Sequence, residues 1–299
     1  MIYLRQEFVR AILSWRFGLS LFIALLLLLV TLIEFYPLDP TPPPLDDFTE
    51  NVDVENLPPE ARRLKPIPPL EEWRFAYYNA YEAWMRAVGW GFFPLYAFLA
   101  ATLPYADSLA QERAQKFARY VLLRTRHRSY LFVKFLVNGL AGGLSVALPM
   151  AFFLGFTSWK YVRDLPPLSG TILESWLSCS SVYQAFLCDL YHINPDLYIF
   201  LRIVLGFVFG IVFATFGMSI SAFTNNRYVI LFFPFIFGIM LAYGLNFLGI
   251  PVFIPLYALV PTGISGTDAM TIFPPLGIIF LCSLAIVALR IKKHSETPY

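Results

Sequence analysis

Long, nearly uninterrupted apolar runs restrict the folds open to this chain more than any other feature of its sequence. Residues 18–36 form the first such run. A helix needs about 20 predominantly apolar residues to cross a lipid bilayer. Charged residues make up only 14% of the 299 residues, whereas soluble domains average about 25%. We therefore expect an all-α polytopic membrane protein.

Six apolar runs are long enough to be membrane-spanning helices. No small-residue cleavage site follows the first run, so we expect it to remain as the first span rather than to be removed as a signal peptide. All six spans would belong to one transmembrane domain, residues 18–299. The predicted spans cover, approximately, residues 18–36, 86–104, 132–156, 199–223, 228–248 and 272–290.

Residues 1–17 have the pattern of an amphipathic helix that lies in the membrane interface. Apolar side chains recur at Leu4, Phe8 and Ile12, while Arg5 and Arg10 fall elsewhere around the helix. Such helices place their apolar face in the headgroup region of a bilayer. The pattern predicts an N-terminal interfacial helix, and the alternative is a frayed basic leader.

Three segments between the spans have the composition of external loops: 37–85, 158–198 and 249–271. The first begins with a proline-rich stretch that cannot continue a helix. Helical spacing returns in its second half, where aromatic residues form one face; this face could anchor the chain at the interface or contact a substrate. The residues of this face are Trp73, Tyr77, Ala80, Trp84 and Val88. The third segment is apolar but too interrupted by proline and glycine to cross as a helix.

The distribution of charge predicts the orientation of the spans. Segments 1–17, 105–134 and 290–299, together with Arg227, hold 14 of the 22 Lys and Arg residues but only 4 of the 20 Asp and Glu residues. Basic residues near the ends of spans favour the cytoplasmic side. We therefore expect both termini and the basic segment 105–131 to be cytoplasmic.

The predicted spans offer little chemistry of their own. Glu34 and Arg202 lie near predicted outer ends, where their side chains can reach water. Ion-coupled transporters use ionisable side chains buried in the membrane, and we expect no such relay here. The sequence also contains no Gly-rich phosphate loop ending in Lys-Ser/Thr and no His or Cys at metal-ligand spacing. We therefore expect neither an enzyme nor a metal or cofactor site in this chain.

Two smaller features concern cysteines and small residues. Cys179 and Cys188 both fall in the predicted external segment 158–198, where they could form a disulfide or remain free. Gly206, Gly210 and Ala214 recur at four-residue spacing in the fourth span. Small residues at this spacing let two helices approach closely, so we expect them at a helix-packing contact.

The basic segment 105–131 has its own helical pattern. Ser108 and Gln111 fit a capping box, which predicts a helix start. One apolar stripe would then contain Ala110, Ala114, Phe117 and Val121. The opposite, solvent-facing side would contain Glu112, Lys116 and Arg119. The pattern predicts a short amphipathic helix lying on the membrane, although an ordinary basic loop that touches anionic lipid would have a similar charge.

This segment resembles the connection between spans 2 and 3 in the permease subunits of type-2 ABC transporters. The family pattern has an acidic residue, a Glu-Arg pair, a leucine pair, a basic loop and a lysine that opens span 3. The chain has Lys116-Phe117 where the family has Gly-Thr. The matching residues, in order, are Asp107, Glu112-Arg113, Leu122-Leu123, Arg124, Arg128, Tyr130 and Lys134.

The resemblance implies a membrane-spanning subunit of an ATP-driven exporter in a prokaryotic cell membrane. Two permease chains, identical or related, would pair with a cytosolic ATPase dimer that binds ATP and Mg²⁺. No nucleic acid would take part. The helix after span 2 would dock on the ATPase, and residues 249–271 would re-enter the outer leaflet. The coupling residues implied are Asp107, Gln111, Glu112, Arg113, Lys116, Arg119, Arg124 and Arg128.

A second hypothesis needs no transport. The basic cytoplasmic segment 105–131 could recruit lipid or a soluble partner, and the chain would then be a membrane scaffold or assembly factor.

Overall fold

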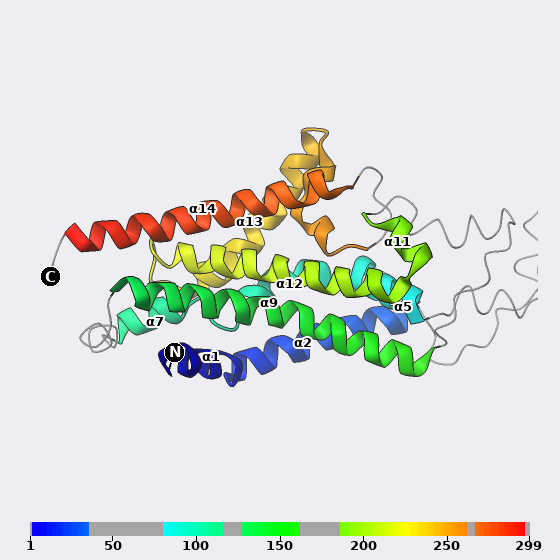
Figure 1. Cartoon of the computed structure of the whole chain (residues 1–299), viewed down its shortest axis with the longest axis horizontal. Helices are drawn as coiled ribbons and strands as arrows, with labels where there is room; N and C mark the ends of the chain where they lie inside the picture. The colour runs from blue at the N-terminus through cyan, green and yellow to red at the C-terminus, as the bar shows by residue number, and fades with distance from the viewer. Residues whose placement is uncertain (1, 36–79, 116–126, 162–185, 262–266, 297–299) are drawn as a thin grey trace, which may run out of the picture.

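A computed structural model describes residues 2–35, 80–115, 127–161, 186–261 and 267–296 of the chain. These residues form an elongated bundle of helices and contain no β-strand, so the all-helical prediction is confirmed for this part of the chain (Figure 1). The α-helices are α1 Ile2–Ile12, α2 Trp15–Phe35, α5 Ala80–Trp90, α6 Phe93–Thr102, α7 Ser108–Ala114, α9 His127–Lys160, α11 Cys188–Ile193, α12 Pro195–Ile220, α13 Arg227–Phe247 and α14 Ala269–Glu296.

Five of these helices, α2, α9, α12, α13 and α14, are long and apolar enough to cross a membrane. By length and composition, these helices are those of a multi-pass membrane protein. The single span predicted at 86–104 is instead divided between α5 and α6, and α6 is apolar but only 10 residues long. The number of candidate spans is thus five, not six, within the described residues.

Gly91 and Pro94 explain the division between α5 and α6. Gly91 approaches α2 so closely that a Cβ atom there would lie 2.0 Å from the Thr31 hydroxyl oxygen. Pro94 lies in the first turn of α6, where its missing amide hydrogen is tolerated. The close contact with Thr31 and the proline together favour a new helix start over one continuous helix.

The aromatic face predicted for an external loop is buried instead. Ala80, Trp84 and Val88 are fully buried in α5, which packs against α2 and α9. The indole nitrogen of Trp84 donates a hydrogen bond of 2.9 Å to the carbonyl of Met150. The prediction that this face anchors the chain at the membrane interface is wrong for these residues. Trp73 and Tyr77 lie outside the described residues.

The small residues of α12 pack against α9 in the centre of the bundle. Gly210 and Ala214 face Gly142, where a Cβ atom would lie 2.3 Å from the Ala214 Cβ and 3.0 Å from the Gly210 carbonyl oxygen. The side-chain amide nitrogen of Asn138 donates a 2.6 Å hydrogen bond to the Ala214 carbonyl. Gly206 lies beside the Met150 sulfur. These small residues therefore serve a close contact within the chain.

Residues 249–261 contain two 3-10 turns, η3 Pro251–Phe253 and η4 Pro255–Ala258, which contact α12, α13 and α14. Arg202 and Tyr198 in α12 bind the end of this segment, and Arg202 donates to the carbonyl of Val260 at 3.5 Å. Its guanidinium donates to the carbonyl of Phe186 at 2.7 Å and to the hydroxyl of Tyr198 at 3.1 Å. Tyr198 in turn donates to the carbonyl of Pro261. Arg202 is only 1% exposed, so the prediction that it extends to the outer surface is wrong.

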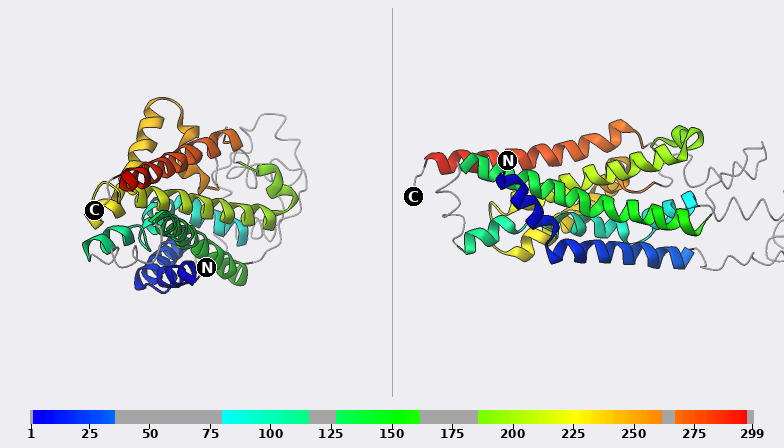
Figure 2. Two further views of the ribbon diagram at one scale, coloured as in Figure 1. Left: turned by 60° about the vertical axis from the view of Figure 1, so that its left-hand side comes forward. Right: turned by 60° about the horizontal axis from the view of Figure 1, so that its bottom comes forward.

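The two ends of the bundle carry different elements (Figures 1 and 2). The N-terminus, α7 and the C-terminal end of α14 lie at one end, and α5 and α11 lie at the other. We call these the α7 end and the α11 end. At the α7 end, α1 and α2 are separated by a bend at Leu13 and Ser14, and α1 packs against α9.

Candidate functional site

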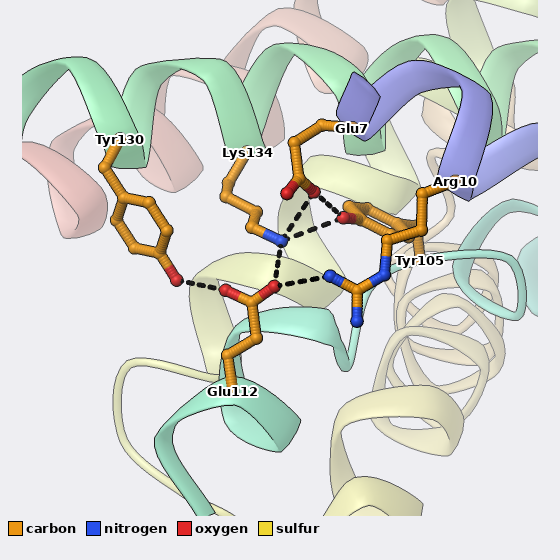
Figure 3. A network of polar contacts seen from close by, with 6 residues as sticks. All are labelled: Glu7, Arg10, Tyr105, Glu112, Tyr130 and Lys134. Carbon is orange, nitrogen blue, oxygen red and sulfur yellow. Dashed lines mark hydrogen bonds and ion pairs between the residues drawn. The ribbon is translucent and has the colours of Figure 1, made fainter. Parts of the chain in front are cut away.

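Polar side chains from three helices meet at the α7 end of the bundle (Figure 3). Glu7 and Arg10 come from α1, Glu112 from α7, and Tyr130 and Lys134 from α9. Tyr105, which lies between α6 and α7, completes the group. We call these six residues the buried ionic cluster. They bring together segments that are more than 100 residues apart in the chain, as the 102-residue separation of Arg10 and Glu112 shows.

Lys134 lies at the centre of the cluster and is fully buried. Its ammonium group donates to Glu112 at 2.6 Å, to Glu7 at 2.7 Å and to the hydroxyl of Tyr105 at 2.8 Å. A lysine ammonium has three N–H donors, so every donor of Lys134 has a partner. A buried charge with complete hydrogen bonding is one that a folded protein can tolerate.

Glu112 accepts hydrogen bonds from three residues of the cluster. Besides Lys134, its carboxylate accepts from Arg10 at 3.0 Å and from the hydroxyl of Tyr130. The Glu112 side chain is 3% exposed, while Arg10 is 55% exposed and reaches the cluster from the surface. Glu112 is therefore held by α1 on one side and by α9 on the other.

The charges of the cluster determine its protonation. Burial raises the pKa of Glu7, but the Lys134 charge and hydrogen bonds from Lys134 and Tyr105 outweigh burial and lower that pKa below its usual value. Burial, together with the hydrogen bond to Glu7 and the neighbouring carboxylates, raises the pKa of Tyr105. At neutral pH Glu7 is therefore ionised and Tyr105 keeps the proton that it donates to Glu7.

The start of α7 is fixed by a further ion pair, outside the buried ionic cluster. Arg16, in the first turn of α2, donates to both oxygens of Asp107 at 2.8 and 2.9 Å. Gln111 donates to the same carboxylate at 2.6 Å. Asp107, not Ser108, precedes the first residue of α7, and its side chain makes no capping bond to the backbone. The capping box predicted for Ser108 and Gln111 is therefore wrong, because Ser108 is already the first residue of α7 and the Gln111 side chain binds the Asp107 carboxylate.

The end of α7 is attached to the end of α12. Arg113 donates to the carbonyl of Ser221, the residue that follows α12, at 2.8 Å. α7 therefore has polar attachments to the beginning of α2, to α1 and α9 through Glu112, and to the end of α12.

The orientation of α7 differs from the prediction. Glu112 was expected to face solvent but is buried, and Ala114 was expected in the apolar stripe but is exposed. The inward direction of Glu112 has a physical cause, since its carboxylate completes the hydrogen bonding of buried Lys134 and accepts from Arg10 and Tyr130. Gln115, which follows α7, is also exposed.

Several predicted site residues fall outside the described part of the chain. Among the coupling residues these are Lys116, Arg119 and Arg124, and of Arg128 only the helical backbone at the start of α9 is described. The possible disulfide also lies outside, because Cys179 and the side chain of Cys188 are not described.

Glu7, Arg10 and Arg16 were not predicted as site residues. One signal for Glu7 is present in the sequence, because Leu4, Glu7, Phe8 and Ala11 have the spacing of one helix face. An acidic residue in the middle of an apolar face is a candidate for a buried ion pair. No local pattern indicates its partner, since Lys134 follows 127 residues later.

Comparison of the chain with protein-family models, curated proteins and solved structures finds no match. The function must therefore be argued from the site itself. Within the described residues no three His, Cys, Asp or Glu side chains are grouped so that they could hold a metal ion. The ion pairs of the cluster join three helices, and this arrangement is suited to fixing the position of α7.

Proposed function

We propose that this chain is the membrane-spanning permease subunit of an ATP-driven ABC exporter, and that it couples to a separate cytosolic ATPase through residues 107–123. The ATPase dimer would bind ATP and Mg²⁺, and a second permease chain would complete the substrate pathway. This chain would supply the pathway and the mechanical link, and it would not hydrolyse ATP.

The attachment of α7 to the rest of the bundle is the observation that carries the proposal. α7 is short, lies at one end of the molecule and exposes Ala114 and Gln115. Its ion pairs and hydrogen bonds reach α1, α2, α9 and α12. A force applied to α7 by a docked partner would therefore reach helices that cross the membrane. A loop that only recruits lipid has no need of these attachments.

We propose that α5 and α6 together make a sixth crossing, in addition to the five long apolar helices. α5 and α6 follow one another from the α11 end towards the α7 end, and together they cover residues 80–102 (Figures 1 and 2). If they form a broken sixth span, both termini lie on the same side of the membrane as α7. The basic residues of segments 1–17 and 105–134 favour the cytoplasm for that side.

The opposite end would face outward. There, Arg202 and Tyr198 hold residues 186 and 260–261 against α12. The 3-10 turns between Pro251 and Ala258 would form an apolar cap over the outer leaflet end of the pathway. A hydrophobic or amphipathic substrate is consistent with the apolar exposed faces of α13 and α14.

Purification with a phosphate-loop ATPase tests the proposal. We expect tagged chain in lipid vesicles to retain such an ATPase, beginning with any that is encoded beside its gene, and to raise its ATP hydrolysis several-fold. The matched control is the same ATPase with its phosphate-loop lysine replaced, which should bind without hydrolysis. A chain that retains no ATPase and leaves the hydrolysis rate unchanged would instead fit the scaffold hypothesis.

A further inference from the structure

Four ion pairs of the α7 end join six charged side chains from two parts of the chain. The N-terminal part contributes Glu7, Arg10 and Arg16, with a net charge of +1. The ion-paired residues of α7, its preceding residue and α9 are Asp107, Glu112 and Lys134, whose charges sum to −1. Without the other part, Glu7 would be a buried carboxylate with no lysine partner, and the buried carboxylates of Asp107 and Glu112 would outnumber Lys134, which is costly. Together the six charges sum to zero.

Glu7 is connected to α7 through Lys134. It has hydrogen bonds to Lys134 and to Tyr105, neither of which lies in α7. Lys134, however, donates to Glu7 and Glu112 at nearly equal distances, 2.7 and 2.6 Å. The Lys134 ammonium is therefore held between a carboxylate of α1 and a carboxylate of α7. Loss of the Glu7 charge would leave the ammonium paired with Glu112 alone and would remove its ion pair to α1.

Glu7 adds polar contacts to a face of α1 that also has apolar contacts. Ala11 of α1 lies in a small apolar cluster with Tyr105, Val137 and Ala141, and Leu4 and Phe8 pack against that cluster. Tyr105 therefore contacts α1 through this apolar cluster and through the hydrogen bond that it donates to Glu7. When Glu7 holds α1 in place, Arg10 is also positioned to reach Glu112.

We propose that Glu7 is a positioning residue for α7: it holds Lys134 and α1 in the places from which Lys134 and Arg10 bind Glu112. The N-terminal helix is then part of the coupling device and not only a membrane anchor. This inference relies on the proposed function for its consequence in transport, but the position of α7 can be measured in the chain alone.

Two pairs of spin labels test this inference in full-length chain whose three cysteines have been replaced, in lipid nanodiscs. One pair, at the exposed positions Val9 and Gln115, reports the distance between α1 and α7. The other pair, at Phe132 and Gln115, reports the position of α7 relative to α9. Val9 is 44% exposed and Phe132 is 65% exposed, so the labels should not disturb the core.

We expect Glu7→Gln to broaden the distance distributions of both pairs, since α1 loosens and α7 moves with it. A change confined to the Val9 pair would overturn the proposal, because α1 would then detach without moving α7. Unchanged distributions for both pairs would overturn it as well. Glu7→Gln retains the size of the side chain and removes its charge, so the comparison isolates the ion pair.

A second comparison applies if Glu7→Gln lowers the amount of folded protein. Lys134→Met leaves two buried carboxylates opposite Arg10 alone, whereas Glu7→Gln with Lys134→Met restores one carboxylate opposite one guanidinium. We expect the Phe132–Gln115 distribution to be narrower in the double variant than in Lys134→Met. Equal or broader distributions in the double variant would contradict a role for Glu7 through Lys134.

The outcomes for this inference and for the proposed function are separable. An α7 that shifts in Glu7→Gln, in a chain that binds no ATPase, would overturn the proposed function but not the positioning role. If the ATPase binds the chain normally but α7 does not shift in Glu7→Gln, the positioning role would be overturned and the proposed function would not. If both proposals hold, Glu7→Gln should lower the amount of substrate moved per ATP hydrolysed.

Discussion

Lys134→Met is expected to destabilise the chain by about 3–5 kcal/mol, the usual cost of removing one partner of a buried ion pair. The cost arises because Lys134 is fully buried and donates to both Glu7 and Glu112. Methionine fills similar space but leaves these carboxylates without their shared cation. The apparent melting temperature of detergent-solubilised protein, followed by fluorescence-detected size-exclusion chromatography, measures the loss.

Arg10→Met is the matched control, because it removes a cation from the same carboxylate. Arg10 is 55% exposed, and an exposed ion pair contributes only about 0–1 kcal/mol. We expect a small shift for Arg10→Met and a large one for Lys134→Met. Similar shifts for the two variants would show that burial of Lys134 does not determine the stability of the cluster.

Gly142→Ala is expected to disrupt the contact between α9 and α12. The added Cβ would lie 2.3 Å from the Ala214 Cβ and 2.6 Å from the carbonyl oxygen of Ala101. Overpacking of a core costs about 1–3 kcal/mol, and the upper part of that range applies because a backbone atom cannot move aside cheaply. The yield of monodisperse protein and its melting temperature should both fall.

Gly155→Ala controls for the change in helix propensity. Gly155 lies in the same helix, α9, but a Cβ there would have no atom within 4 Å. Alanine is favoured over glycine in a helix by about 0.5–1 kcal/mol, so this variant should be as stable as the original or slightly more so. A Gly142→Ala variant as stable as Gly155→Ala would contradict the close approach of α9 and α12.

Apolar patterning predicted the helical character of the chain because each long run must satisfy its backbone hydrogen bonds internally. The same patterning failed at α5 and α6. The contact between Gly91 and Thr31 that favours the break joins residues 60 positions apart, and a local window of sequence does not contain it. The aromatic residues of α5 also look alike in sequence whether they face lipid headgroups or, as Trp84 does, the core.

The candidate site was predictable only in its location. The clustering of basic residues in 105–134 identified the segment, but the direction in which Glu112 points depends on Lys134 and Arg10 from other helices. When a helix with alanine on one side and charged residues on the other is considered alone, its charged side is expected to face solvent. Buried ion pairs reverse that expectation, and the separations of 127 residues between Glu7 and Lys134 and of 102 residues between Arg10 and Glu112 leave no local pattern that indicates the partners.

Photo-crosslinking at α7 tests the central claim that an ATPase docks there. A photoreactive amino acid at Gln115, which is exposed beside α7, should crosslink to the phosphate-loop ATPase in the assembled complex. The same amino acid at Trp159, which is 80% exposed in the last turn of α9, serves as the control, because that turn lies at the opposite end of the bundle. A crosslink at Gln115 but not at Trp159 is the predicted result, whereas crosslinking at Trp159 alone, or at neither position in a complex that hydrolyses ATP, would contradict docking at α7.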